Sequence, residues 1–132
     1  MLLTTKDIKR KVQNLILTSP YSSQLNSYLD NMYHFTNQIT FPGEYIYSDS
    51  EGYHHVSVQE RGNKVNIQNT LDLDSIISEI LWNLSFNVSL VISKRDTENF
   101  RSNLLNNIVS IIEPLGDIYV DFARKKILDS LE

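Results

Sequence analysis

Three short runs of alternating apolar and polar residues, separated by strong turn signals, constrain the fold of this chain more than any other feature. The runs are Glu44–Ser48, Tyr53–Arg61 and Lys64–Thr70. Asp49-Ser50-Glu51-Gly52 separates the first two runs, and Gly62-Asn63 separates the second from the third. Because both connections are short enough for hairpins, the pattern predicts a three-stranded antiparallel meander.

The two faces of this predicted sheet differ in composition, because alternating residues of a strand point to opposite sides. We expect a core face made of Ile46, Val56, Val58, Val65 and Ile67. The other face, here called the tyrosine face, would collect Tyr45, Tyr47, Tyr53, His55, Ser57, Gln59, Asn66 and Gln68. Tyrosine among small polar residues is typical of protein-binding surfaces. Three states of the tyrosine face stay open: a partner binds it, the N-terminal helices cover it, or it meets solvent.

Apolar residues at helical spacing lie on both sides of the predicted sheet in the sequence. The predicted helices begin at Thr5, at Ser22 or Ser23, at Asp72 or Asp74, after Asp96 or Thr97, and at Asp117. The second helix would extend to Phe35, and the third, the most apolar, would cover the valine-bearing core face. We therefore predict one α+β domain over residues 1–132, with two N-terminal helices, the meander, and three C-terminal helices packed on it.

The charge distribution is uneven along the chain. The net charge is −4, but residues 30–121 carry 13 acids against 5 bases. An acidic middle repels nucleic acid and attracts a basic partner, although the same excess can serve solubility alone. The basic segment Lys6–Lys11 lacks aromatic residues and is better interpreted as a solvated helix face than as a nucleic-acid site.

Composition also favours a cytoplasmic protein. The chain has no cysteine, which excludes disulfides, thiolate zinc sites and a cysteine nucleophile. The N-terminus lacks the apolar region of a secretory signal, and no uninterrupted run of about 18 apolar residues predicts a membrane span. We expect a cytoplasmic location and no membrane partner.

No residue cluster predicts catalysis, a metal or a cofactor. His54-His55 with Glu60 is the one group with suitable side chains, but adjacent strand residues point to opposite faces and cannot readily chelate one ion. The serines lack the contexts of known nucleophiles, and the four glycines are scattered at turns rather than forming a phosphate loop. The sequence therefore predicts that the protein is not an enzyme.

Two motifs resemble a family of bacterial proteins. The run from Gly52 to Gly62, GYHHVSVQERG, resembles the glycine–tyrosine strand ending in Glu-Arg-Gly of immunity protein 63, a group of polymorphic-toxin immunity proteins. Asp72–Asp74 before a long apolar helix, followed by Lys94–Arg101, is similar to the Arg…Asp-x-x-Arg helix start of that family. The resemblance spans residues 43–115. The chain departs from the family pattern by having few aromatic residues after the fourth predicted helix.

The resemblance implies a cytosolic protein that binds and neutralises a cognate toxin domain, as in contact-dependent growth inhibition. Many such toxins are nucleases with basic clefts, which the acidic middle would suit. We expect the toxin-binding residues to be Tyr45, Tyr47, Asp49, Glu51, Tyr53 and His55, with Asp96 and Glu98 as an acidic rim. A non-enzymatic adaptor or regulatory module is the alternative, and the free protein is expected to be a monomer or a homodimer.

The family motif itself is assigned a structural role. Gly62 suits a tight hairpin turn that needs positive φ. We expect Arg61 and Arg101 to pair with acidic side chains and so join the sheet to the helices. Glu60 belongs to the same motif.

Overall fold

The computed structural model describes residues 2–93 and 99–131, and its helices and strands follow the predicted order. The helices are α1 (Thr5–Ile16), α2 (Ser22–Met32), α3 (Leu73–Ile92), α4 (Phe100–Ile112), the short 3-10 helix η1 (Glu113–Leu115) and α5 (Asp117–Leu131). The strands are β1 (Tyr33–His34), β2 (Gly43–Asp49), β3 (Gly52–Val58) and β4 (Lys64–Thr70). The predicted α+β class, with helices before and after the sheet, is confirmed.

Side-chain caps explain why α1 and α3 begin where they do. The Thr4 hydroxyl accepts a hydrogen bond from the backbone N–H of Asp7, and the Asp72 carboxylate accepts one from that of Asp74. Of the two predicted starts of the third helix, Asp72 and Asp74, the structure has Asp72 as the cap. The predicted start of the fourth helix at Asp96 or Thr97 lies outside the described residues, within which α4 begins at Phe100.

The sheet contains one strand more than predicted. Its order is β1-β2-β3-β4, with β2, β3 and β4 forming the predicted antiparallel meander. β1 adds to it in parallel, with Tyr33 opposite Glu44 and His34 opposite Tyr45. The chain leaves α2 at Met32 and becomes extended at Tyr33, so Phe35 lies outside the helix predicted to contain it. A two-residue strand is too short to show an alternating pattern.

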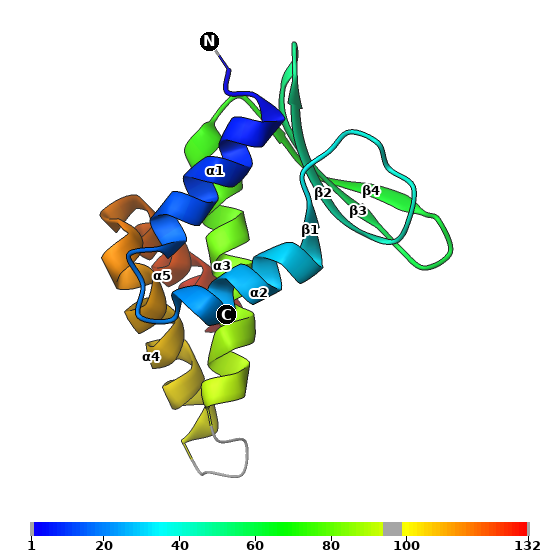
Figure 1. The fold of residues 1–132 in the computed structure, drawn as a ribbon. Coiled ribbons are helices and arrows are strands. Elements are labelled where there is room, and N and C mark those ends of the chain that lie inside the picture. Colours follow the sequence, from blue (N-terminus) through cyan, green and yellow to red (C-terminus); the bar gives the residue numbers. More distant parts are fainter. Residues whose placement is uncertain (1, 94–98, 132) are drawn as a thin grey trace.

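The helices pack together, and the sheet projects from them (Figure 1). The β2–β3 turn lies at the same end of the molecule as the N-terminus, whereas the β3–β4 turn points away from the helices. The most apolar helix, α3, runs through the helical body and contacts the other long helices, as the sequence predicts for the centre of the core.

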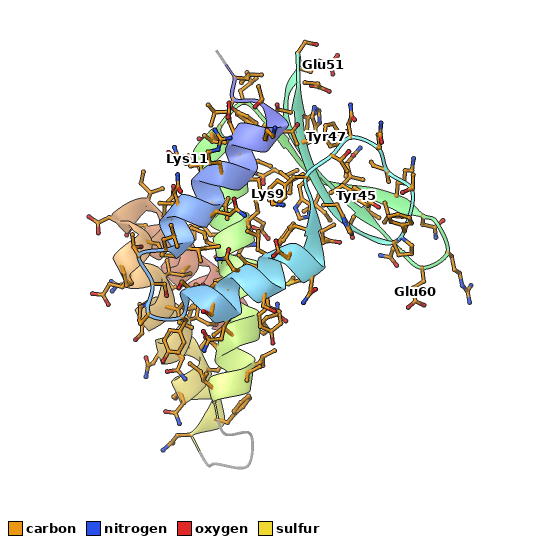
Figure 2. The ribbon with its side chains drawn as sticks, in the orientation of Figure 1. Lys9, Lys11, Tyr45, Tyr47, Glu51 and Glu60 are labelled. Atoms are coloured by element: carbon orange, nitrogen blue, oxygen red, sulfur yellow. The ribbon has the colours of Figure 1, made fainter. Side chains whose placement is uncertain are left out.

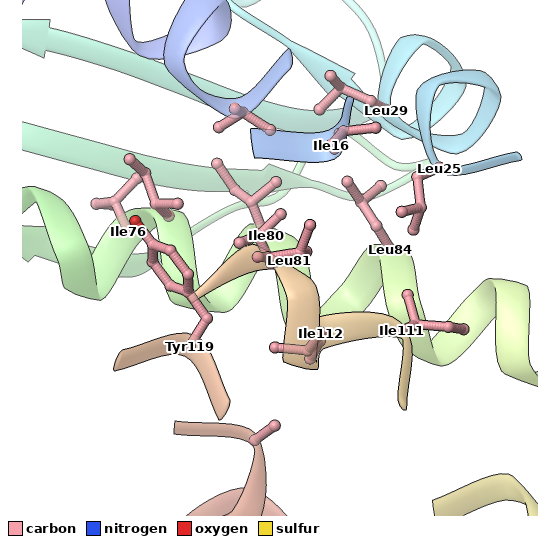
Figure 3. Packing of buried hydrophobic residues seen from close by; sticks show 14 of the residues in the cluster. Ile16, Leu25, Leu29, Ile76, Ile80, Leu81, Leu84, Ile111, Ile112 and Tyr119 are labelled. Carbon is pink, nitrogen blue, oxygen red and sulfur yellow. The ribbon is translucent and has the colours of Figure 1, made fainter. Parts of the chain in front are cut away.

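The main core surrounds α3 (Figure 3). Its buried residues Ile76, Ile80 and Leu84 pack among residues of α1, α2, α4, η1 and α5. By length and composition alone α3 could cross a membrane. Half of its apolar stretch is buried within the fold. Core helices meet the same criteria of length and composition, so these two properties alone do not assign α3 to a membrane.

Candidate protein-binding surface

The register of the β2–β3 hairpin contradicts the predicted division of the sheet into a core face and a tyrosine face. Asp49 stands opposite Gly52, so Ile46 pairs with His55 and Tyr45 pairs with Val56. Residues that stand opposite each other share a face. Even-numbered residues of β2 therefore share a face with odd-numbered residues of β3, and the prediction that Ile46 lies beside Val56 and Val58 is wrong.

The inner face of the sheet, which carries Ile46 and Tyr53, packs against the helical body. Both side chains belong to the main core. The Tyr53 hydroxyl accepts a hydrogen bond of 2.8 Å from the backbone N–H of Leu3. Ser48 Oγ donates to the Leu3 carbonyl at 2.7 Å, and the Ser48 N–H donates to Thr5 Oγ1 at 3.0 Å. Tyr53, predicted to contact a toxin, thus holds the N-terminal segment against the sheet.

The outer face carries Tyr45, Val56 and Val58, which form a second apolar cluster with Ile39. The loop between β1 and β2 covers this cluster. Tyr45 Oη donates to the carbonyl of Phe41 at 2.7 Å and accepts from its N–H at 3.1 Å. Tyr45 is only 1% exposed, so its predicted outward presentation is wrong. The expectation that α3 would cover the valine face is also wrong.

A polar cluster surrounds His55 on the inner face. His55 Nε2 lies 2.9 Å from Glu44 Oε1, and Ser57 Oγ donates to Glu44 Oε2 at 2.6 Å. The carboxylate of Glu44 therefore stands between the hydroxyl and the imidazole. A catalytic triad needs the imidazole next to the hydroxyl, so this order does not activate Ser57. His55 is 2% exposed, which contradicts its predicted toxin contact.

Tyr33 lies beside the same cluster. Its ring centroid is 5.9 Å from that of His55, and its hydroxyl accepts a hydrogen bond of 2.8 Å from Asn83 Nδ2 on α3. Burial raises the pKa of Tyr33 well above its usual value, although the Asn83 hydrogen bond acts in the opposite direction. The phenol stays neutral and ties β1 to α3.

The two histidines point to opposite faces, as the strand pattern predicts. His54 stacks on Tyr47, with ring centroids 4.7 Å apart, and its Nε2 lies 2.8 Å from Asp49 Oδ1. Within the described residues, no group of three or more His, Asp or Glu side chains is arranged to hold a metal ion.

An irregularity in the pairing of β3 with β4 separates two predicted core residues from Val56 and Val58. His55 stands opposite Gln68, but Val56 stands opposite Asn66, so Ile67 is an extra residue in β4. Such a bulge interrupts the alternation of side chains between faces. Both Val65 and Ile67 are exposed, and their predicted core positions are wrong.

The β2–β3 turn and the start of α3 together form an exposed surface, which we call the acidic end surface. We define it by Tyr47, Asp49, Glu51, Leu71 and Asp72. Gly52 brings these segments together, because a Cβ atom there would lie 2.8 Å from the Thr70 carbonyl oxygen and 3.4 Å from the Leu71 side chain. Glu51 lies at the tip of the turn, at one end of the sheet (Figure 2).

Three of the predicted binding residues, Tyr47, Asp49 and Glu51, belong to the acidic end surface. Asp49 and Glu51 are exposed, and Tyr47 is half-buried. The sequence analysis missed Leu71, an apolar residue that is 71% exposed between a strand end and a helix cap. The position of Leu71 between a strand and an N-cap aspartate is the one sequence signal that could have indicated its exposure.

The pKa of the Asp49 carboxyl is lowered by its hydrogen bonds. The hydrogen bond from His54 lowers the pKa of the Asp49 carboxyl, and the backbone N–H of Glu51, 2.8 Å from Oδ1, acts in the same direction. The folded state therefore favours the ionised form. Asp49 stabilises the fold at pH values above the usual aspartate pKa and loses this effect as the pH falls through the lowered value.

We predict that the stability difference between the wild-type protein and Asp49→Asn depends on pH. The wild type should be the more stable at neutral pH, and the difference should disappear well below the usual aspartate pKa of about 4. Thermal unfolding of both proteins over a pH series measures this, and an NMR titration of the Asp49 carboxyl carbon measures its pKa directly. A difference that persists unchanged in acid would contradict the assignment.

The residues of the family motif lie at the far end of the sheet. Glu60 and Arg61 are exposed beside the β3–β4 turn, where Gly62 has the predicted positive φ of 82°. Neither Arg61 nor Arg101 forms an ion pair with a described acidic residue, so the expected connection between sheet and helices is not made within that part of the chain. The predicted rim residues Asp96 and Glu98 lie outside the described residues.

Comparisons of this chain with protein-family models, with curated proteins and with solved structures find no match.

Proposed function

We propose that this protein is a bacterial immunity protein that binds a cognate toxin domain, a nuclease, and neutralises it in the cytoplasm by blocking its active site or an adjacent surface. The acidic end surface is the observation that carries the proposal. It replaces the tyrosine face as the proposed binding region, because Tyr45, Tyr53 and His55 are buried in the free protein.

Electrostatics favour a basic partner at this surface. Asp49, Glu51 and Asp72 are exposed there, and the whole chain has a net charge of −4. A nuclease must attract the phosphates of its substrate, so its cleft is positively charged. Complementary charges accelerate the encounter of two proteins and select between partners, and the effect weakens as the salt concentration rises.

The acidic end surface also offers apolar contact area. Leu71 projects into solvent, and the half-buried ring of Tyr47 is fixed by stacking on His54. Large side chains held in one conformation lose little entropy on binding and often provide most of the binding energy at the centre of an interface. Tyr47 meets this description and Leu71 adds exposed apolar area, so these two are the proposed anchors, with the carboxylates around them.

Expression of the neighbouring gene tests this function. We expect the product of the gene directly upstream to arrest growth when expressed alone and to be tolerated when this protein is made with it. The two proteins should copurify, and this protein should inhibit cleavage of nucleic acid by the purified partner. A harmless neighbour that still forms a stable complex would instead indicate an adaptor, and a neighbour that does not bind at all would contradict both functions.

A further inference from the structure

The outer edge of β4 is open to pairing with another strand. In the order β1-β2-β3-β4, β4 pairs only with β3 among the described strands. The backbone N–H and C=O groups on its other side therefore point away from the sheet, and such edges are templates for an added strand. β4 is seven residues long, whereas β1 at the opposite edge has only two.

The edge strand lacks most of the features that usually prevent pairing. The segment from Lys64 to Thr70, KVNIQNT, contains no proline and one charged residue. Every residue of this segment is exposed or half-exposed, and Val65 and Ile67 are 43% and 47% exposed. Lys64 and the bulge at Ile67 are its protective features, and the bulge disturbs the pairing with β3. A long, partly apolar edge of this kind is expected to pair.

The charges along β4 are asymmetric. Their arrangement indicates that the strand added at this edge comes from a second copy of the chain. The start of the strand has a net charge of +1, from Arg61 and Lys64 with Glu60. The residues after its end have a net charge of −2, from Asp72 and Asp74. An antiparallel second copy of the strand would bring the basic end of each chain to the acidic end of the other. The edge is therefore complementary to itself, as a two-fold symmetric interface requires.

We propose that the free protein forms a homodimer by antiparallel pairing of two β4 strands about a two-fold axis at Gln68. This register brings the end of β4 that carries Lys64 next to the end that Leu71 and Asp72 follow in the second copy. The two-fold symmetry repeats this arrangement at the other end of the paired strands. The pairing extends the sheet across the dimer, and its small area predicts a weak, concentration-dependent association. Leu71 also belongs to the acidic end surface, so the dimer and a toxin complex would exclude each other at that end of the sheet.

A cysteine at the symmetry axis tests the pairing directly, because the natural chain contains no cysteine. Residues opposite each other in an antiparallel pair have Cα atoms about 4.5–5.5 Å apart, which is within the range of a disulfide. We expect Gln68→Cys to form a disulfide-linked dimer rapidly under mild oxidation with copper–phenanthroline. The control Ser102→Cys, on the exposed face of α4, should form far less.

Sedimentation velocity of the cysteine-free protein over a range of concentrations gives the second measurement. We expect a monomer–dimer equilibrium that Lys64→Glu weakens about tenfold, because each Lys64 would lie near the acidic strand end of the second copy and the substitution turns attraction into repulsion twice. Lys64→Gln should weaken it less. A monomer at every concentration would overturn the proposal. So would a dimer that neither cross-links through position 68 nor responds to Lys64→Glu. Both measurements use this protein alone, so they do not depend on toxin binding.

Discussion

Replacing Ile46 with alanine should destabilise the protein by about 3 kcal/mol, because truncating a buried isoleucine removes apolar contacts and leaves a cavity. Ile46 is 0% exposed and lies on the inner face of β2, where the sheet meets the helical body. Its side chain belongs to the same cluster as Ile8 and Val12 of α1 and Ile76 of α3. Urea denaturation monitored through Trp82 fluorescence measures the change in the free energy of unfolding.

Ile67→Ala is the matched control, because it makes the same chemical change on another strand of the same sheet. Ile67 is 47% exposed, so its truncation should cost less than about 1 kcal/mol. Denaturation at low protein concentration keeps dimerisation from contributing to the measurement. If Ile67→Ala destabilises the protein as much as Ile46→Ala, then Ile67 is a core residue, as the sequence pattern alone predicts.

The helices were predictable from the sequence because their signals are local. A cap is formed by residues that are two or three positions apart, as for Thr4 and Asp7 or Asp72 and Asp74. The apolar spacing of α3 likewise identifies its buried side without reference to any other element. These signals give the order of the helices and the central position of α3.

The faces of the sheet were not predictable from alternation alone. Alternation relates residues within one strand, but the register of the hairpin decides which face of the next strand joins them. The pairing of Asp49 with Gly52 places Ile46 beside His55 instead of Val56. The extra residue Ile67 then changes the alternation again in β4. No local residue type indicates a bulge at that position.

The candidate site was partly predictable for a related reason. Residues of a turn are exposed whatever the arrangement of the elements that follow it, so Asp49 and Glu51 are at the surface as expected. The burial of Tyr45 depends instead on a loop that folds back over β2 and bonds its hydroxyl through Phe41. That contact results from tertiary packing, and tyrosine composition alone cannot distinguish it from a binding surface.

The second large effect concerns toxin binding and depends on the proposed function. The double substitution Asp49→Asn with Glu51→Lys removes two negative charges from the acidic end surface and adds one positive charge, which raises its net charge by three. The amide introduced at position 49 keeps an oxygen that can accept the hydrogen bond from the residue 51 N–H, so the turn is preserved. We expect this variant to bind the toxin domain about 30-fold more weakly, or by about 2 kcal/mol, mainly through slower association. Surface plasmon resonance at low and high salt separates association from dissociation rates.

A charge-matched control separates a local effect from an effect of net charge. Asp121→Asn with Glu113→Lys raises the net charge by the same three units, on α5 and η1, at positions that are also exposed. Because long-range charge is screened beyond a Debye length of about 8 Å in physiological salt, this control should bind nearly as well as the wild type. If both double variants lose the same affinity, the toxin domain responds to the net charge of the protein, and the acidic end surface is not its binding site. If neither loses affinity while the wild type still neutralises the toxin, the interface lies on another face, and the exposed carboxylates of the β2–β3 turn serve solubility alone.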